Sequence, residues 1–190
     1  AAIIGTVMRS GRTTMRVAFV IGALACAGLL GYGYYLQYAQ GLEPCPLCLV
    51  QRGFFYAVGA MFLLGALHGP GRAGAWVYAL LVALFAAGGA AAAGRQVWLQ
   101  HLPAEKVPAC GPDLFFMLEN FPLAQTLQKL IQGTGECAVV DWSFLGLSIA
   151  GWALVWFAGL ALYALVVAAR TKSGSEPDYA PFPEVEGKYR

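Results

Sequence analysis

The sequence predicts an all-α, polytopic membrane protein: a four-helix bundle with a short interfacial helix in its second outer loop. Three observations predict this class: 59% of the 190 residues are hydrophobic, only 12% are charged, and four apolar stretches are long. Soluble domains carry about a quarter charged residues. A spanning helix needs about 20 apolar residues, because at 1.5 Å per residue this length crosses a hydrocarbon core of roughly 30 Å.

Each apolar stretch is expected to form one spanning helix of a single membrane domain. The four expected spans cover about residues 17–38, 49–67, 75–99 and 144–169. The first run is too long for the apolar core of a cleaved signal peptide, so we expect it to remain as an anchor. Residues before Met15 are expected to lie outside the fold, and residues 171–190, which mix Ser, Gly, Pro and charges, are expected to form a solvated tail.

Basic residues near the helix ends predict the orientation, because cytoplasmic loops are enriched in Lys and Arg. Arg16 precedes the first span, Arg72 lies in the second connection, and Arg170 follows the fourth span. Both termini are therefore expected in the cytoplasm, and the loops of about residues 39–48 and 100–143 on the outer side. The small net charge of +2, without a long basic cluster, argues against a nucleic-acid partner.

The two expected outer loops contain most of the cysteines. Four of the five cysteines lie there: Cys45, Cys48, Cys110 and Cys137. Outside the cytoplasm the environment is oxidising, so disulfides form and persist. The outer side of the membrane is therefore where we look for a functional site.

Cys45 and Cys48 form a C-x-x-C pair that leads directly into the second expected span. The free N–H groups and the positive dipole end of a helix N-terminus favour a thiolate. A static staple, half of a zinc site and a chance pair are the other interpretations of this motif. A zinc site would need further ligands at matching spacing, and a disulfide across so short a loop stabilises little. Redox chemistry is the preferred interpretation, and no metal site is expected.

Arg52 follows Cys48 by four residues, which places both side chains on one helix face. A guanidinium there would favour the thiolate form of the cysteine. The alternative is an interfacial Arg whose side chain merely extends to water. A charged residue at the membrane boundary is costly unless it is paired or functional, so both interpretations stay open.

Cys110 and Cys137 lie near the two ends of a connection of about forty residues. A bond between them would stabilise the fold by roughly 3 to 4 kcal/mol, so a structural staple is one interpretation. Thiol exchange is the other, because Cys110 stands in an irregular Pro- and Gly-containing setting that a partner's thiolate can reach. The enclosed segment 113–131 is expected to form the interfacial helix, which either holds Cys137 near the first pair or covers the bundle.

These features resemble the DsbB family of bacterial disulfide bond formation proteins over nearly the whole chain. The resemblance rests on Pro44-Cys45-Pro46-Leu47-Cys48 followed by Gln51-Arg52, on Cys110 and Cys137, and on Asp141-Trp142-Ser143-Phe144-Leu145-Gly146-Leu147. It implies a protein dithiol:quinone oxidoreductase of the bacterial inner membrane, with the cysteine loops in the periplasm. The implied partner is a periplasmic thiol oxidase of the DsbA type, in the route that keeps the periplasm oxidising. The implied electron acceptor is ubiquinone, with menaquinone as the alternative.

The resemblance also assigns roles to the cysteines. The reduced partner would attack the loop disulfide and form a mixed disulfide with Cys110. The released Cys137 would attack Cys45, and Cys48 would leave as the thiolate that meets the quinone. This order agrees with the helix N-terminus favouring Cys48 as a leaving group.

Three further residues are candidates for the quinone site. Arg52 matches the family's Arg that supports the adduct between thiolate and quinone. Members of the family carry a His near the outer end of the third helix, where this chain has Gln96. Gln96 and its neighbour Arg95 are therefore candidate quinone contacts, and an interfacial anchor is the other interpretation of Arg95.

Two other functions remain as alternatives. An enzyme similar to vitamin K epoxide reductase also has four helices and two cysteine pairs, but there the helix-borne pair follows the loop pair. In this chain the helix-borne pair comes first. A non-enzymatic four-span membrane protein would use the outer cysteines as static staples, and it would form no mixed disulfide with a soluble protein.

Overall fold

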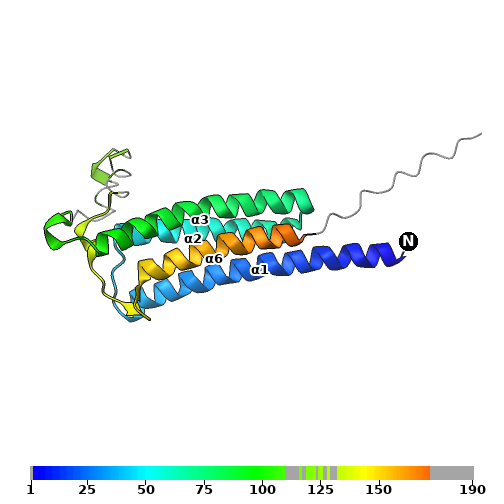
Figure 1. The fold of residues 1–190 in the computed structure, drawn as a ribbon, viewed down its shortest axis with the longest axis horizontal. Coiled ribbons are helices and arrows are strands. Elements are labelled where there is room, and N and C mark those ends of the chain that lie inside the picture. The colour runs from blue at the N-terminus through cyan, green and yellow to red at the C-terminus, as the bar shows by residue number, and fades with distance from the viewer. Residues whose placement is uncertain are drawn as a thin grey trace, which may run out of the picture.

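The body of the protein is a bundle of four long helices that run side by side (Figure 1). The computed structural model describes residues 2–109, 116, 119–122, 124–125, 128 and 132–171. The four helices are α1 (Ala2–Ala39), α2 (Pro46–His68), α3 (Arg72–Gln100) and α6 (Ile149–Arg170). Among the described residues, each of these helices contains a stretch long and apolar enough to cross a membrane. The predicted all-α, four-helix membrane fold is therefore confirmed.

Helix α1 begins earlier than the sequence predicts. The residues before Met15 are predicted to lie outside the fold, but the helix starts at Ala2. In Figure 1 the N-terminal part of α1 extends beyond the ends of the other three helices. The physical reason is that residues 2–14 contain no proline, so nothing interrupts the helical hydrogen bonds. The part that qualifies as a membrane span is Thr13–Ala39.

Small side chains let the helices approach closely in the middle of the bundle. One face of α3 is at most 1% exposed at Ala75, Ala79, Val82, Ala86 and Ala93. Gly89 lies on the same face, and a Cβ added there would stand only 2.3 Å from the Phe157 ring of α6. Phe157 also stacks on Phe55 of α2, with ring centroids 4.0 Å apart. Small residues in helix interfaces are typical of membrane bundles, where close packing drives association.

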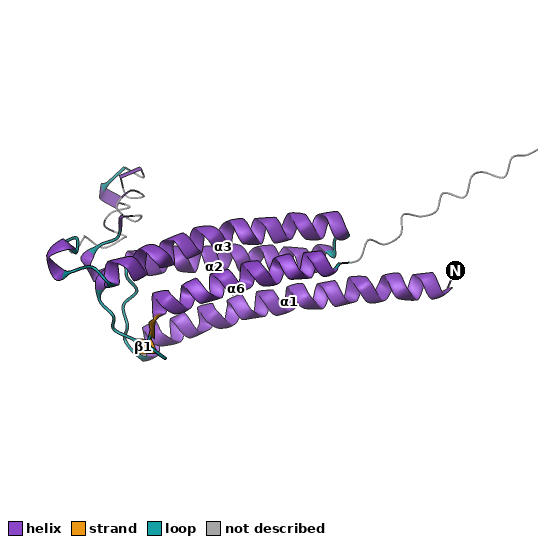
Figure 2. Ribbon diagram, viewed as in Figure 1, coloured by secondary structure: helices purple, strands orange, loops and turns teal. Residues whose placement is uncertain are grey.

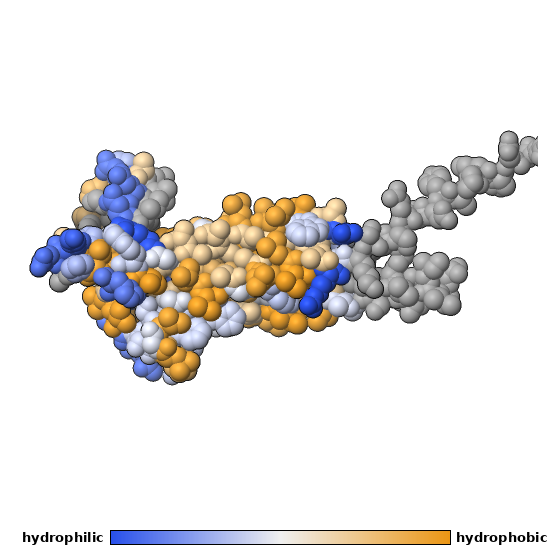
Figure 3. Space-filling view, in the orientation of Figure 1, coloured by the Kyte–Doolittle hydropathy of each residue, from blue (hydrophilic) through white to orange (hydrophobic). Residues whose placement is uncertain are grey.

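The outer face of the bundle is apolar along its length. Figure 3 shows hydrophobic side chains over the middle of the helices and hydrophilic ones towards both ends. The large side chains that are more than half exposed include a leucine on each helix: Leu24, Leu67, Leu80 and Leu162. Such a surface would be an aggregation hazard in water, whereas lipid tails cover it in a bilayer.

Local backbone chemistry places the C-x-x-C pair at the first turn of α2. Cys45 is the N-cap residue, with extended backbone angles of φ −65° and ψ 163°, and Pro46 follows in the first turn. Proline is favoured there because its fixed φ suits the helix and its missing N–H would have no helical partner. At the other end Gly69 adopts φ 57°, and its N–H donates to the Gly65 carbonyl at 3.0 Å. The end of the bundle that holds Cys45 is called the cysteine end below.

The fourth helix begins later than the sequence predicts. The expected span begins near residue 144, but α6 starts at Ile149. The residues before it form a short antiparallel hairpin of β1 (Ser143–Phe144) and β2 (Leu147–Ser148) at the cysteine end (Figure 2). A short apolar run fits a strand as well as a helix, so composition alone does not separate the two.

The hairpin turn and a helix cap explain this boundary. Leu145 and Gly146 have φ values of 52° and 80°, and two successive positive φ angles are typical of a tight hairpin turn. Ser148 then caps α6, because its Oγ accepts a hydrogen bond from the Gly151 N–H at 3.2 Å. The chain therefore turns before it enters the membrane helix.

The long connection between α3 and α6 is described only in part. Its described ends contain two short 3₁₀ helices, η1 (Ala104–Lys106) and η2 (Gly135–Ala138). The predicted interfacial helix over about residues 113–131 lies largely outside the described residues, and so does Cys110. Helix η2 contacts both α2 and α3, which fixes this end of the connection to the bundle.

Candidate functional site

The two thiols of the C-x-x-C pair meet at the first turn of α2. Their Sγ atoms are 3.2 Å apart, and the Cys45 thiol donates a hydrogen bond to Cys48. Both are free thiols, Cys45 being 9% exposed and Cys48 half-buried. A disulfide joins two sulfur atoms at about 2.05 Å, so oxidation of this dithiol, with loss of two electrons and two protons, needs only a small movement of the sulfur atoms.

Helix η2 brings the loop cysteine Cys137 to the same place. Its side chain is completely buried and packs with Cys45, Leu47 and Leu99. The Cys45 thiol donates a hydrogen bond to the Cys137 sulfur, and the Leu47 backbone N–H, in the first turn of α2, donates another. The sulfur of a distant loop therefore lies against the first cysteine of the helix pair.

These hydrogen bonds decide which sulfur is the thiolate. The hydrogen bond from Cys45, helped by donors from Leu47 and Thr134, lowers the pKa of Cys137 to about 6 although burial opposes it. The pKa of Cys45 is raised, because its single S–H proton is shared between Cys137 and Cys48 and because the thiol is desolvated. At neutral pH the cluster therefore contains a Cys137 thiolate beside a Cys45 thiol.

A pH titration checks this assignment. We expect the ultraviolet absorbance of thiolate in the fully reduced protein to fall on acidification with a midpoint near pH 6, because Cys137 is a thiolate above its pKa and takes up a proton below it. The step should be missing in Cys137→Ser. It should persist in Cys26→Ser, which removes a buried thiol that packs against Gly59 in the middle of the bundle. An unchanged step in Cys137→Ser would contradict the assignment.

Gly133 lets the segment before η2 lie close against the helices. Its φ of 75° is in the left-handed region, which favours glycine. A Cβ at this position would stand 2.6 Å from Leu99 Cδ1 and 2.9 Å from Leu47 Cδ1. The next residue, Thr134, is buried at 7% exposure, and its Oγ1 lies 3.8 Å from the Cys137 sulfur. A residue with a side chain at 133 would therefore strain the backbone and displace Leu99 and Leu47.

Arg95 of α3 holds the residue before this glycine. Its Nε and Nη2 donate to the Gln132 carbonyl at 3.3 and 3.0 Å, and its guanidinium lies 4.2 Å from the centre of the Trp98 ring. Arg95 is absent from the lining of the cavity described next. Arg95 is predicted as a quinone contact, but in the structure its described contacts anchor the loop that carries Cys137.

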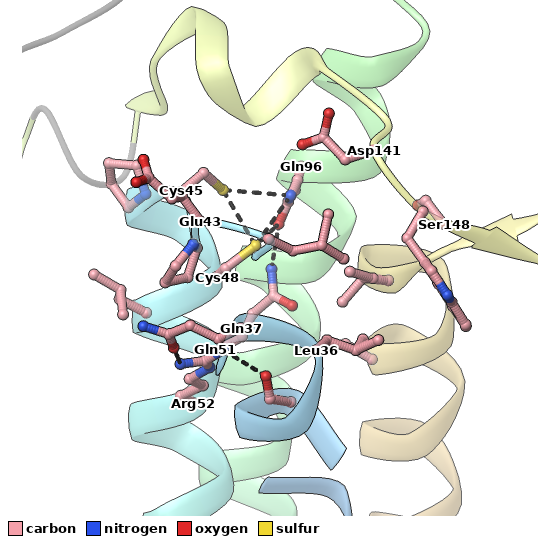
Figure 4. A pocket seen from close by; sticks show the side chains of 18 of the residues that line it. Leu36, Gln37, Glu43, Cys45, Cys48, Gln51, Arg52, Gln96, Asp141 and Ser148 are labelled. Carbon is pink, nitrogen blue, oxygen red and sulfur yellow. Dashed lines mark hydrogen bonds between the residues drawn. The ribbon is translucent and has the colours of Figure 1, made fainter. Parts of the chain in front are cut away.

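A cavity of about 520 Å³ opens beside the C-x-x-C pair. Side chains from all four helices line it, and Figure 4 shows polar groups converging on it from α1, α2 and α3. Its volume falls in the range of about 300–1,000 Å³ that is usual for small-molecule sites. Cys48 lines this cavity, so a ligand bound there would lie next to its sulfur.

Two buried glutamines lie below the sulfur atoms. Gln51 and Gln96 are each 4% exposed, and Gln51 Nε2 donates to Gln96 Oε1 at 2.7 Å. Gln96 Nε2 lies 3.4 Å from both Cys45 Sγ and Cys48 Sγ (Figure 4). The structure therefore brings the predicted residue Gln96 to the redox pair. In the sequence, Gln51 is noted only as part of the motif that follows Cys48. Its position three residues after Cys48, on the same helix face, could have predicted that it belongs to the site.

Arg52 lines the cavity but points to α1. Its Nη1 donates to Gln37 Oε1, and its Nη2 donates to the Gly33 carbonyl at 3.0 Å. The guanidinium also lies 4.8 Å from the centre of the Tyr34 ring. These partners of Arg52 are all on α1. The charge therefore lies in the cavity wall and not at the Cys48 sulfur, where the helical spacing predicts it.

Comparison with known proteins places the chain in a family. The family described as Disulfide bond formation protein DsbB matches residues 15–167. A "Disulfide bond formation protein B" of Methylococcus capsulatus is 51% identical over 151 residues, which are 80% of this chain and 92% of the relative. Proteins of the same name from Hahella chejuensis and Aromatoleum aromaticum are 55% and 48% identical, over 77% and 88% of this chain and 88% and 100% of each relative. The buried thiol cluster is thus that of a DsbB chain: the protein belongs to the DsbB family of disulfide bond formation proteins.

Proposed function

We propose that this chain forms disulfide bonds by reoxidising a periplasmic dithiol protein of the DsbA type and passing the electrons to a membrane quinone. The observation that supports this most is the packing of the buried Cys137 against Cys45, at a cavity that Cys45 and Cys48 line. Membership of the DsbB family favours disulfide formation over a protein whose cysteines are static staples. In this proposal both chain termini are cytoplasmic and the cysteine end faces the periplasm.

The proposed exchange begins in the loop. A thiolate of the reduced partner attacks Cys110 in a Cys110–Cys137 disulfide, which forms a mixed disulfide and releases Cys137 as a thiolate. After the released Cys137 has bonded to Cys45, the second thiolate of the partner attacks the partner's other sulfur in that mixed disulfide. The partner leaves oxidised, and Cys110 leaves as a thiol after taking up a proton.

The released Cys137 passes the electron pair to the helix. Its thiolate attacks Cys45 Sγ, the Cys45–Cys48 bond breaks, and Cys48 leaves as a thiolate with the electrons of that bond. The donors from Leu47 and Thr134 support this direction, because they lower the pKa of Cys137 and do not depend on a proton on Cys45. Burial of both sulfur atoms in one cluster means that little motion is needed.

The residues around the cavity fit a quinone. Apolar side chains such as Leu36 and Phe55 form most of its wall, and Gln37, Gln51 and Arg52 offer donors for carbonyl oxygens. When bound, the quinone supplies the acceptor for two electrons and two protons. Arg52 would orient the ring, since Gln37 and the Gly33 carbonyl already fix its guanidinium. We propose ubiquinone as the acceptor, with menaquinone as the alternative.

Quinol formation by the purified chain tests this function. The full chain in lipid nanodiscs with ubiquinone is mixed with a reduced thioredoxin-like dithiol protein. We expect one quinol for each disulfide formed in the soluble protein, and no quinol with Cys48→Ser, which cannot pass the electrons on. Oxidation of the soluble protein without quinol, or no reaction at all, would contradict the proposal.

Arg52→Met should separate the two halves of the reaction. We expect it to slow quinol formation about tenfold or more, because hydrogen bonds from a charged group are lost. Exchange with the soluble protein should stay nearly unchanged. The matched control is Arg95→Met, because Arg95 holds Gln132 in the loop and does not line the cavity. It should slow the exchange and leave quinol formation by the pre-reduced helix pair intact. Equal losses in both steps for either variant would contradict this division.

A further inference from the structure

A hydrogen-bonded pair of amide side chains supports the redox sulfurs from inside the bundle. Gln51 of α2 and Gln96 of α3 are both buried, and within the described residues no buried polar side-chain atom lacks a partner. Figure 4 shows the Gln96 amide between the two cysteines and Gln51. Neither glutamine has a titratable group, so the pair cannot exchange protons with the thiols in the physiological range.

The Gln96 amide has a donor end and an acceptor end. The hydrogen bond from Gln51 determines how the amide is oriented. Gln51 Nε2 donates to Gln96 Oε1 at 2.7 Å, a good hydrogen-bond distance. With its oxygen occupied in this way, Gln96 turns its NH₂ group towards Cys45 and Cys48, 3.4 Å from each sulfur. Rotating the amide would put the NH₂ groups of Gln51 and Gln96 against each other, which is unfavourable in a buried site.

The same amide can serve both protonation states of Cys48. As a thiol, Cys48 donates to Gln96 Oε1 at 3.5 Å. As a thiolate, it accepts from Gln96 Nε2. A hydrogen bond to an ionised acceptor is stronger than one to a neutral acceptor, so the amide favours the thiolate state.

We propose that Gln96 is a catalytic residue that donates a hydrogen bond to the Cys48 thiolate released by exchange, and that Gln51 is a positioning residue that orients the Gln96 amide. The inference rests on the proposed exchange and deepens it. When the Cys137 thiolate bonds to Cys45, the Cys45–Cys48 bond breaks and its electron pair stays on Cys48. The Gln96 NH₂ group stabilises that charge without giving up a proton. The guanidinium of Arg52 is bound to Gln37 and to the Gly33 carbonyl. The Gln96 amide is therefore the side chain that contacts Cys48 when the negative charge forms on its sulfur.

The consequence is a more oxidising helix disulfide. Any group that stabilises the reduced, thiolate form of a pair more than its disulfide raises the reduction potential of that pair. A raised potential is what an oxidase needs in order to draw electrons from a partner that is itself a strong oxidant. Gln51 contributes to this potential only through Gln96, because its described hydrogen bond is to that amide.

The equilibrium of the isolated helix pair in a thiol redox buffer tests the inference. The background is the quinone-free full chain with Cys110→Ser and Cys137→Ser, which leaves one outer pair. Methionine is close to glutamine in size but lacks the amide, so the variants are Gln96→Met, Gln51→Met and both together. The matched control is Gln100→Met, because Gln100 lines the same cavity from the same helix but accepts from Ser148 at 2.7 Å.

We expect Gln96→Met to shift the equilibrium towards the disulfide about tenfold, the usual effect of losing a hydrogen bond to a charged group. Gln51→Met should shift it in the same direction, and the double variant should match Gln96→Met alone, because Gln51 acts through Gln96. Gln100→Met should shift it less than about twofold, as expected for a residue without sulfur contacts. A merely structural role for Gln51 would lower the melting temperature without moving this equilibrium. The proposal would be overturned if the shifts of Gln96→Met and Gln51→Met were additive in the double variant, or if Gln51→Met left the equilibrium unchanged. A shift in Gln100→Met as large as that in Gln96→Met would also overturn it.

A measurement on the unsubstituted glutamines keeps the test independent of folding defects. In the same background, the side-chain amide proton signal of Gln96 should move when the pair is reduced, and that of Gln100 should stay. A Gln96 signal that is unchanged on reduction would overturn the proposal. Neither experiment uses the soluble partner or a quinone, so a negative result here leaves the electron route standing, and failed quinol formation leaves this result unaffected.

Discussion

Replacing Cys137 with Ser should abolish turnover and trap the soluble partner on Cys110. The physical reason is that the serine hydroxyl cannot replace the Cys137 thiolate that attacks Cys45, so electrons no longer reach the helix pair. With its loop partner gone, the Cys110 thiol attacks the disulfide of the oxidised soluble protein and forms a mixed disulfide that Cys137 cannot resolve. A non-reducing gel should show this adduct, and quinol formation should fall to background.

The control for this prediction is Cys26→Ser. Cys26 is buried in the middle of α1, packs in the main apolar core and lies outside the thiol cluster. We expect it to keep its turnover and to form no more adduct than the parent chain. A Cys137→Ser chain that turns over normally, or that forms no adduct with Cys110, would show that the cysteines do not act in the proposed order.

Gly133→Ala should give the second largest effect, by moving Cys137 away from Cys45. An alanine must adopt a φ of 75° and bring its Cβ within 2.6 Å of Leu99 and 2.9 Å of Leu47, both of which are buried. Left-handed strain and overpacking each cost about 1–3 kcal/mol, so we expect exchange with the soluble protein to slow at least about tenfold. Quinol formation by the pre-reduced helix pair should be nearly unchanged, and stopped-flow mixing measures both steps.

Gly41→Ala separates the effect of backbone strain from the effect of the collision with neighbouring side chains. Gly41 has a similar φ of 66°, but a Cβ there would have no neighbour within 4 Å. The substitution therefore adds the backbone strain without the collision. We expect less than about a threefold change in exchange, because the strain of roughly 1 kcal/mol comes without a displaced neighbour. Equal losses in the two variants would mean that the fit of Gly133 against α2 and α3 does not matter for the reaction.

The membrane fold and the helix-borne pair could be predicted from the sequence because both depend on local signals. Four apolar runs determine the four spans, and a Pro in the first turn fixes the start of α2 after Cys45. The hairpin before α6 could not be predicted, because Phe144, Leu145 and Leu147 extend the apolar run of the helix that follows and the turn depends on a positive φ at Leu145. The early start of α1 does not follow from the sequence, because residues before Met15 mix apolar, polar and basic side chains without a long apolar run.

The contacts of the site could be predicted only in part. The pair of Cys45 and Cys48 follows from spacing, but the contact between Cys45 and Cys137 depends on a loop far away in the sequence. Helical spacing places Arg52 on the face of Cys48 without showing that acceptors on α1 hold its guanidinium. The amide of Gln96 reaches the sulfurs through a contact between two helices, which no pattern in a single helix reveals.

Mapping of the disulfides during a single turnover tests the central claim most directly. The oxidised chain with bound quinone is mixed with reduced soluble dithiol protein, quenched with acid, and its disulfide-linked peptides are identified by mass spectrometry. The account predicts that one and the same chain holds a bond from the partner to Cys110 and a bond from Cys45 to Cys137, and that both appear before quinol. A partner joined directly to Cys45, or a Cys45–Cys48 bond that stays intact while quinol forms, would contradict it.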